Sequence, residues 1–145
     1  MSDEVKQIEE FCNLWRMMRS SFNLDKRKEE YPRIESLTTM EISIITIVYE
    51  REDIILKEIC TILDIPKSTL TSAIDRLERL NYINRTVSKR DRRSFGLQLT
   101  EEGYAVLDER IELEKQLYGS ILNALDTNEE KEILLDLLRK IVKKI

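Results

Sequence analysis

Apolar residues recur at helical spacing over most of the chain. In residues 3–23 they lie three or four positions apart, which predicts one helix with a heptad-like stripe: Ile8, Phe11, Trp15, Met18 and Phe22. Similar stripes predict further helices over residues 37–49, 56–63, 66–80, 101–125 and 127–145. Two capping boxes, Thr38 with Glu41 and Thr127 with Glu130, mark where two of these helices begin.

A tight connection joins two of the short helices. After residues 56–63 come the letters L-D-I-P, in which Asp64 tolerates a left-handed backbone and Pro66 suits a helix start. Two helices joined in this way form a helix-turn-helix. Asn81 is an acceptable C-cap for the second helix, and the charged residues 24–36, which include Pro32, predict a loop or a broken turn.

The pattern changes to period two after this helix. Ile83, Arg85 and Val87 alternate with polar residues, and residues 95–99 repeat the alternation with Phe, Leu and Leu on one face. These runs predict a β-hairpin, and Ile54 and Ile55 predict a very short strand beside it. The predicted fold class is therefore mostly α with a small β wing, a winged helix-turn-helix.

The second helix of the helix-turn-helix has two different faces. Its apolar stripe, which predicts packing on a core, is Leu70, Ile74, Leu77 and Leu80. The opposite face near the helix start is rich in small hydroxyl side chains, which are mediocre helix formers: Lys67, Ser68, Thr69, Thr71 and Ser72. Short polar groups there let a helix approach a phosphate backbone and base edges, so this face is a candidate DNA-binding surface.

The tip of the predicted hairpin is basic. Four cations surround the single acid Asp91: Lys89, Arg90, Arg92 and Arg93. The whole chain has a net charge of −4, whereas residues 67–93 hold eight Lys or Arg and three acids, a local net charge of +5. Salt bridges along a solvated face are the ordinary explanation of such charge runs. That explanation fits Arg76 beside Glu78 better than it fits four cations on one tip, which favours a footprint for a polyanion.

Composition argues against several other classes of protein. The 145 residues contain no His, the usual general base and the commonest metal ligand. No Gly-rich phosphate loop is present, and Cys12 and Cys60 lack C-x-x-C spacing. We therefore expect no enzyme, no catalytic residues, no metal and no cofactor. No apolar run approaches the roughly 18 residues of a membrane span and no signal peptide precedes the first helix, so we expect a cytoplasmic protein without membrane contact.

The terminal helices carry more apolar surface than one small winged helix can cover. A second copy of the chain is the favoured partner, which would give an isologous dimer. The predicted organisation is a DNA-binding region at 34–99 and a helical dimerisation region at 1–33 and 100–145. Completion of a monomeric core by the same helices is the alternative.

Three stretches together resemble the MarR (multiple antibiotic resistance regulator) family of transcription factors: residues 65–85, the wing residues D-R-R at 91–93 and L-T-E-E-G at 99–103. The resemblance implies a homodimer that binds pseudo-palindromic DNA operators, usually represses, and is often released by a small molecule. It places Arg76 with the hydroxyl residues on the major-groove side and Arg93 in the minor groove. It also implies that Asp91 supports the wing by pairing with Arg93 or Arg85.

Regulation leaves more than one interpretation open. In the family an aromatic effector often lies beside the dimer helices, where Trp15, Met18 and Phe22 are candidates here, although aromatic residues at helical spacing are more often ordinary core. Some relatives sense peroxide through a cysteine in the first helix, near the position of Cys12; a buried, inert Cys12 is favoured, and Cys60 is assigned to the core. A winged-helix protein-interaction module that never binds DNA is the remaining alternative.

Overall fold

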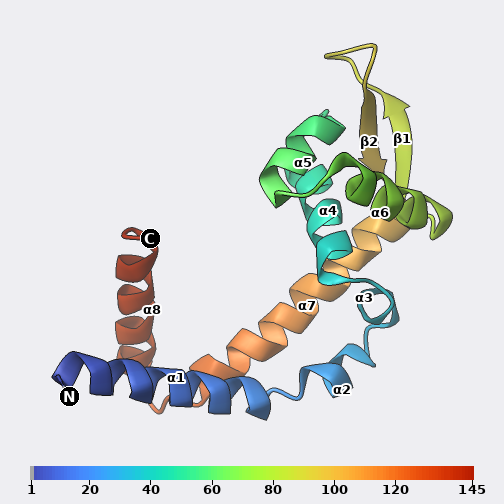
Figure 1. Ribbon diagram of the computed structural model, residues 1–145. Coiled ribbons are helices and arrows are strands. Elements are labelled where there is room, and N and C mark those ends of the chain that lie inside the picture. Colours follow the sequence, from blue (N-terminus) through green and yellow to red (C-terminus); the bar gives the residue numbers. More distant parts are fainter. Residues whose placement is uncertain (1) are drawn as a thin grey trace. The chain divides into compact units, whose positions relative to one another are not determined.

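The computed structural model describes residues 2–145, with the side chains of residues 24 and 25 left aside. It is mostly helical with one two-stranded sheet, as predicted (Figure 1). The chain divides into two compact units, residues 24–111 and residues 1–23 with 112–145. The elements are α1 (Asp3–Ser21), α2 (Leu24–Lys28), α3 (Pro32–Glu35), α4 (Thr39–Glu50), α5 (Leu56–Leu63), α6 (Lys67–Arg79), β1 (Ile83–Val87), β2 (Phe95–Leu99), α7 (Glu101–Asn123) and α8 (Asn128–Val142).

Local signals in the sequence set several of these boundaries. Both capping boxes form: Thr38 accepts from the Glu41 amide and Glu41 accepts from the Thr38 amide, and Thr127 and Glu130 repeat the arrangement at α8. Asp64 ends α5 in the left-handed conformation with φ of 51°, as predicted. Asn81 has φ of 62° just after α6, which places it where an asparagine is tolerated.

The loop predicted for residues 24–36 is wrong in part. Two short helices, α2 and α3, occupy most of it. Pro32 is the first residue of α3, a position where its fixed φ suits a helix and its missing N–H is not needed. The charged run before it is rich in Lys and Arg, which are good helix formers, so the proline starts a helix instead of interrupting one.

The hairpin forms the wing, which we define as residues 83–99. Its antiparallel register pairs Ile83 with Leu99, Arg85 with Leu97 and Val87 with Phe95. Ile55 makes an isolated bridge to Gly96, so the predicted short strand beside the hairpin is confirmed. A Cβ on Gly96 would lie 2.8 Å from Thr86 Oγ1 and 3.3 Å from Asp53 Oδ1, so only glycine fits this close approach without a shift.

The core of the 24–111 unit joins α4, α5, α6 and the wing. Its fully buried apolar side chains are Ile44, Ile45, Ile54, Ile59, Leu70, Ile74, Leu77, Ile83 and Val106. Leu80, predicted to continue the α6 stripe into the core, is 38% exposed. Leu80 is the C-cap residue of α6, where the helical turn ends, and the buried position is taken by Tyr82.

The motif L-T-E-E-G has a packing role at the start of α7. The Thr100 hydroxyl donates to the Asn81 carbonyl at 2.6 Å and accepts from the Gly103 amide at 3.0 Å. A Cβ on Gly103 would lie 2.2 Å from the Tyr82 carbonyl oxygen. The threonine and the glycine thus let α7 begin directly against the turn between α6 and β1.

In the other unit, helices α1 and α8 bury none of their described residues. Leu113 and Leu117 of α7 are buried, whereas the apolar stripes of α1 and α8 remain largely exposed. Among residues 2–145, no helix combines the length and apolarity needed to cross a bilayer.

Candidate nucleic-acid interface

The first turns of α6 present polar groups to solvent. The predicted contact residues there are exposed, apart from a half-buried Thr71: Lys67, Ser68, Thr69, Thr71 and Ser72. The hydroxyl of Thr61 in α5 donates to a carbonyl four residues earlier. By contrast, the four hydroxyls of α6 make no hydrogen bond within the described chain. They are available, together with the unpaired amides of the first helical turn, to contact an anionic backbone.

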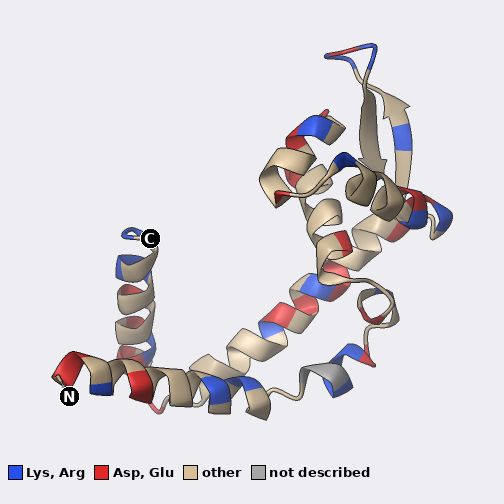
Figure 2. Cartoon of the chain, viewed as in Figure 1, with Lys and Arg blue, Asp and Glu red and all other residues tan. Residues whose placement is uncertain are grey.

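The second predicted contact surface is the wing tip, residues 88–94. The loop projects beyond the strands and is predominantly basic (Figures 1 and 2). Lys89, Arg92 and Arg93 are exposed, and among the described residues no salt bridge reaches their side chains. Three cations held close together without counter-charges favour an anionic partner.

The base of the wing is fixed by Asp53, which the sequence pattern marks only as a turn residue. Its carboxylate accepts from the Arg90 amide at 3.1 Å and from the Lys89 amide and Ser88 hydroxyl, both at 3.4 Å. Asp53 has φ of 50°, a conformation that aspartate tolerates better than most residues. The turn between α4 and α5 therefore holds the wing to the helices.

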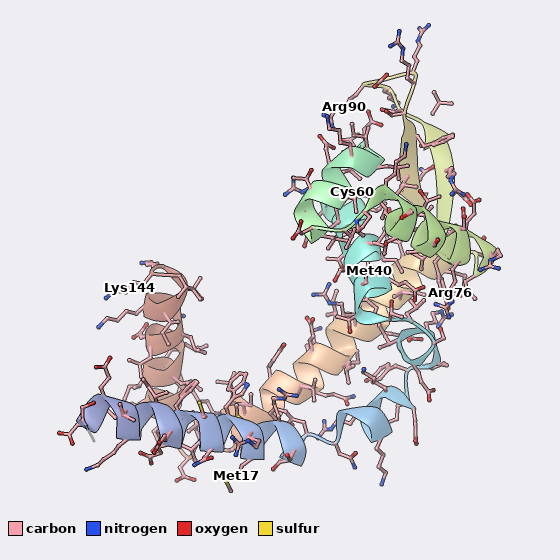
Figure 3. All side chains as sticks on the ribbon, in the orientation of Figure 1. Met17, Met40, Cys60, Arg76, Arg90 and Lys144 are labelled. Atoms are coloured by element: carbon pink, nitrogen blue, oxygen red, sulfur yellow. The ribbon has the colours of Figure 1, made fainter. Side chains whose placement is uncertain are left out.

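Arg90 belongs to this anchor and not to the free tip. Its guanidinium forms two hydrogen bonds with Glu58 of α5, at 2.8 and 3.0 Å, and Figure 3 shows it beside that helix. The Arg90 guanidinium, with help from the Ile55 amide, holds the pKa of Glu58 below its ordinary value. The geometry separates Arg90 from the three unpaired cations, although the sequence groups all four.

Asp91 and Arg85 support the wing differently from the expectation. Asp91 accepts from the Arg93 amide at 2.9 Å and from the Ser94 hydroxyl at 3.3 Å, so it closes the tip through local hydrogen bonds. The guanidinium of Arg85 pairs instead with Asp75 and, at 2.7 Å, with Glu78, both on α6. The expected ion pair between Asp91 and an arginine is therefore wrong, because α6 supplies two carboxylates beside Arg85.

Arg76 lies apart from the exposed hydroxyl face. Its Nη1 is 2.6 Å from the Glu41 carboxylate of α4, and its Nη2 donates to the Ser36 carbonyl at 2.9 Å (Figure 3). The Glu41 side chain is 5% exposed. Burial raises the pKa of Glu41, but the Thr38 amide and the Arg76 guanidinium outweigh it and leave the pKa below its ordinary value.

A hollow of about 520 Å³ lies between α5, α6 and the wing. It brings together three of the predicted contact residues, Lys67, Thr71 and Arg93, and adds Lys57 of α5, which is not among the predicted ones. Lys57 is an exposed cation in the first turn of a short amphipathic helix, a pattern too common to have identified it. The remaining lining residues are Leu56, Cys60, Arg85, Ser94 and Phe95.

The two cysteines do not follow their predicted environments. Both are free thiols; Cys12 is exposed in this chain and not buried, and Cys60 is half-buried at the hollow instead of in the core. Arg16, one turn after Cys12, donates to Asn13 at 3.1 Å. No hydrogen bond between Arg16 and Cys12 occurs among the described residues, so the geometry gives no support to a thiolate activated by Arg16.

Comparison with known proteins identifies the family. A model of the MarR family matches residues 37–95. The HTH-type transcriptional regulator YwhA of Bacillus subtilis (strain 168) is 30% identical over 98 residues, which are 68% of this chain and 70% of YwhA. The chain belongs to the MarR family. The HTH-type regulator PecS of Dickeya dadantii (strain 3937) is 38% identical over 86 residues, 59% of this MarR-family chain, and the chain spans about half (51%) of the length of PecS.

Solved structures agree on the fold of this MarR-family chain. The YusO protein from Bacillus subtilis matches with a TM-score of 0.79 and 22% identity over 100% of both chains. A point mutant of Staphylococcus aureus MepR, bound to an oligodeoxyribonucleotide, matches with a TM-score of 0.68 and 17% identity over 93% of this chain and 98% of MepR. MarR-family proteins are DNA-binding transcriptional regulators and not enzymes, so the predicted class is confirmed.

Proposed function

We propose that the chain is a homodimeric cytoplasmic repressor that binds a pseudo-palindromic operator and is released by a small aromatic effector. The observation that carries the DNA-binding part is the pairing of two exposed surfaces in one unit. The hydroxyl-rich start of α6 has unpaired donors, and the wing tip has three unpaired cations. The MepR structure with bound DNA supports the same use of the fold.

Within this proposal, α6 enters the major groove and the wing tip reaches the adjacent minor groove. Ser68, Thr69, Thr71 and Ser72 would contact base edges or nearby phosphates. Arg93 would enter the minor groove, where a narrow A·T-rich groove attracts a guanidinium, and Lys89 and Arg92 would neutralise phosphates. Lys67 and Lys57, at the hollow, would contact the backbone between the two grooves.

The apolar faces of α1 and α8 support the dimer. Their large apolar side chains are between 41% and 71% exposed: Val5, Ile8, Phe11, Leu14, Trp15 and Met17 on α1, and Ile133, Leu137, Leu138, Ile141 and Val142 on α8. Monomeric proteins rarely leave contiguous apolar surface of this extent in water. A second copy offers a self-complementary cover and would place two α6 helices about 34 Å apart, one turn of DNA.

The effector part of the proposal rests on the aromatic residues of α1. Phe11 and Trp15 stack with ring centroids 6.1 Å apart, and Met18 and Phe22 are half-buried. An aromatic ligand beside them would change the environment of Trp15, the one tryptophan in the sequence. A screen of phenols and aromatic carboxylates by tryptophan fluorescence tests this: effectors should shift Trp15 emission and also release bound DNA. Compounds that do neither would remove the effector from the proposal.

Binding to duplex DNA at increasing salt tests the function itself. The wild-type protein is titrated against a labelled duplex selected from a random library, and log Kd is plotted against log salt concentration. DNA binding predicts a steep slope, because each neutralised phosphate releases counterions and contributes about 0.9. No affinity for the selected or any other duplex at low salt would favour a winged-helix protein-interaction module instead.

A further inference from the structure

Arg76 is bound on two sides by the polypeptide. Its two terminal nitrogens reach the Glu41 carboxylate at 2.6 Å and the Ser36 carbonyl at 2.9 Å. The same Glu41 oxygen accepts from the Thr38 amide at 2.8 Å. One guanidinium thus joins the middle of α6 to the corner between α3 and α4, within the 24–111 unit.

The other end of this corner is held by α7. Glu109 accepts from the Arg33 and Ile34 amides, each at 3.1 Å, and therefore caps the start of α3. The Arg33 side chain pairs with Glu109 at 2.8 Å and with Glu102 at 2.9 Å. Helix α3 is fixed at its first turn by α7 and at its last residues by α6, so the position of α6 depends on the corner.

We propose that Arg76 is a positioning residue for DNA binding: it fixes α6 over the α3–α4 corner through Glu41 and Ser36 and does not itself contact DNA. The proposal rests on the DNA-binding function above and deepens it. Turning Arg76 toward DNA would leave the Glu41 carboxylate, 5% exposed, without its cation. Leaving a nearly buried charge unpaired costs more than one solvent-exposed phosphate contact returns, so the inward pair prevails.

A double-mutant cycle separates positioning from contact. Arg76→Gln, Glu41→Gln and the double variant are titrated against the selected duplex over a range of salt, and Lys67→Gln is the matched control, an exposed cation on the same helix. Positioning predicts that each single variant weakens binding roughly 2- to 30-fold and that the double variant is no weaker than the worse single one. The salt slope should stay at the wild-type value for all three, whereas Lys67→Gln should lower it by about 0.9 for each phosphate that Lys67 neutralises in the wild-type complex.

Arg76→Lys adds a second readout, because it keeps the charge but cannot reach both Glu41 and Ser36 as a planar fork does. Positioning predicts that Arg76→Lys weakens binding like Arg76→Gln, while a phosphate contact would largely survive. Circular dichroism and amide hydrogen exchange over residues 34–41 and 67–79 check that the variants fold and locate the loosening. Exchange should rise in both segments when either partner is changed.

The inference is overturned if Arg76→Gln lowers the salt slope and Glu41→Gln binds as well as the wild type. It is also overturned if the two single effects simply add. A wild-type protein that binds no duplex is a different result, since it removes the proposed function before any variant is compared.

Discussion

Replacing one wing cation should change the salt dependence of DNA binding by an amount that the structure sets in advance. Arg93 is exposed at the wing tip and has no ion pair among the described residues, whereas Arg90, three positions earlier, is paired with Glu58 at 2.8 Å. A dimer presents two wings. If each Arg93 neutralises one phosphate, Arg93→Gln should remove about 1.8 from the slope of log Kd against log salt.

That slope change has a measurable size. Between 50 and 200 mM salt it corresponds to roughly a tenfold smaller decrease in affinity for Arg93→Gln than for the wild-type protein. The affinity at physiological salt should also fall, by about 1–3 kcal/mol for one specific minor-groove contact. Fluorescence anisotropy with the selected duplex, at five or six salt concentrations and fixed pH, measures both quantities.

Arg90→Gln is the matched control for this prediction. It removes the same charge from the same loop, but from a guanidinium already paired with Glu58, so its salt slope should remain near the wild-type value. Far-ultraviolet circular dichroism and light scattering establish that both variants keep their fold and assembly. The reasoning fails if Arg93→Gln keeps the full slope, or if Arg90→Gln reduces it equally.

Three other predictions concern stability and assembly. Gly103→Ala should destabilise the chain by about 1–3 kcal/mol in urea unfolding, since its Cβ would lie 2.2 Å from the Tyr82 carbonyl, whereas Gly119→Ala, with nothing within 4 Å, should be neutral or stabilising; equal effects would contradict the packing role. Glu41 has a lowered folded pKa, so its contribution is present above the unfolded value of about 4.3 and is lost as pH falls through the folded pKa; urea unfolding from pH 7 to pH 3 should show a shallower acid decline for Glu41→Gln, and parallel declines would refute it. Deleting residues 126–145 should give a monomer or an aggregate by light scattering, because the α8 stripe is exposed in the single chain; a soluble truncated dimer would place the interface elsewhere.

Features of the fold that depend on near neighbours in sequence could be predicted. The capping boxes, the left-handed Asp64 and the bridge of Ile55 to the hairpin all follow from residue preferences over a few positions. The exposed hydroxyl face of α6 also follows, because helical periodicity separates it from the buried Leu70 and Leu77. Helix α3 was missed because Pro32 reads as a helix breaker unless its place at the first helical position is known.

The contacts that organise the candidate site join residues distant in sequence. Asp53 reaches amides of the wing tip 36 and 37 positions away, and Arg76 reaches Glu41 over 35 positions. No local rule links such residues in one sequence, since many carboxylates are available to each arginine. The same reason explains the wrong partner for Arg85, whose nearest acids in space come from α6 and not from the loop that follows it.

Charge counted along the sequence therefore overstates the charge that α6 and the wing base present to DNA. The local value of +5 for residues 67–93 already includes Asp75 and Glu78, but it omits three carboxylates from outside that face this segment: Glu41, Asp53 and Glu58. Including them lowers the net charge of the assembled surface to about +2. Because the paired cations are at the base of the wing and along α6, the uncompensated charge is concentrated at the wing tip. Long-range attraction should then act mainly on the wing, while the hydroxyl face of α6 supplies short-range contacts once the duplex has arrived.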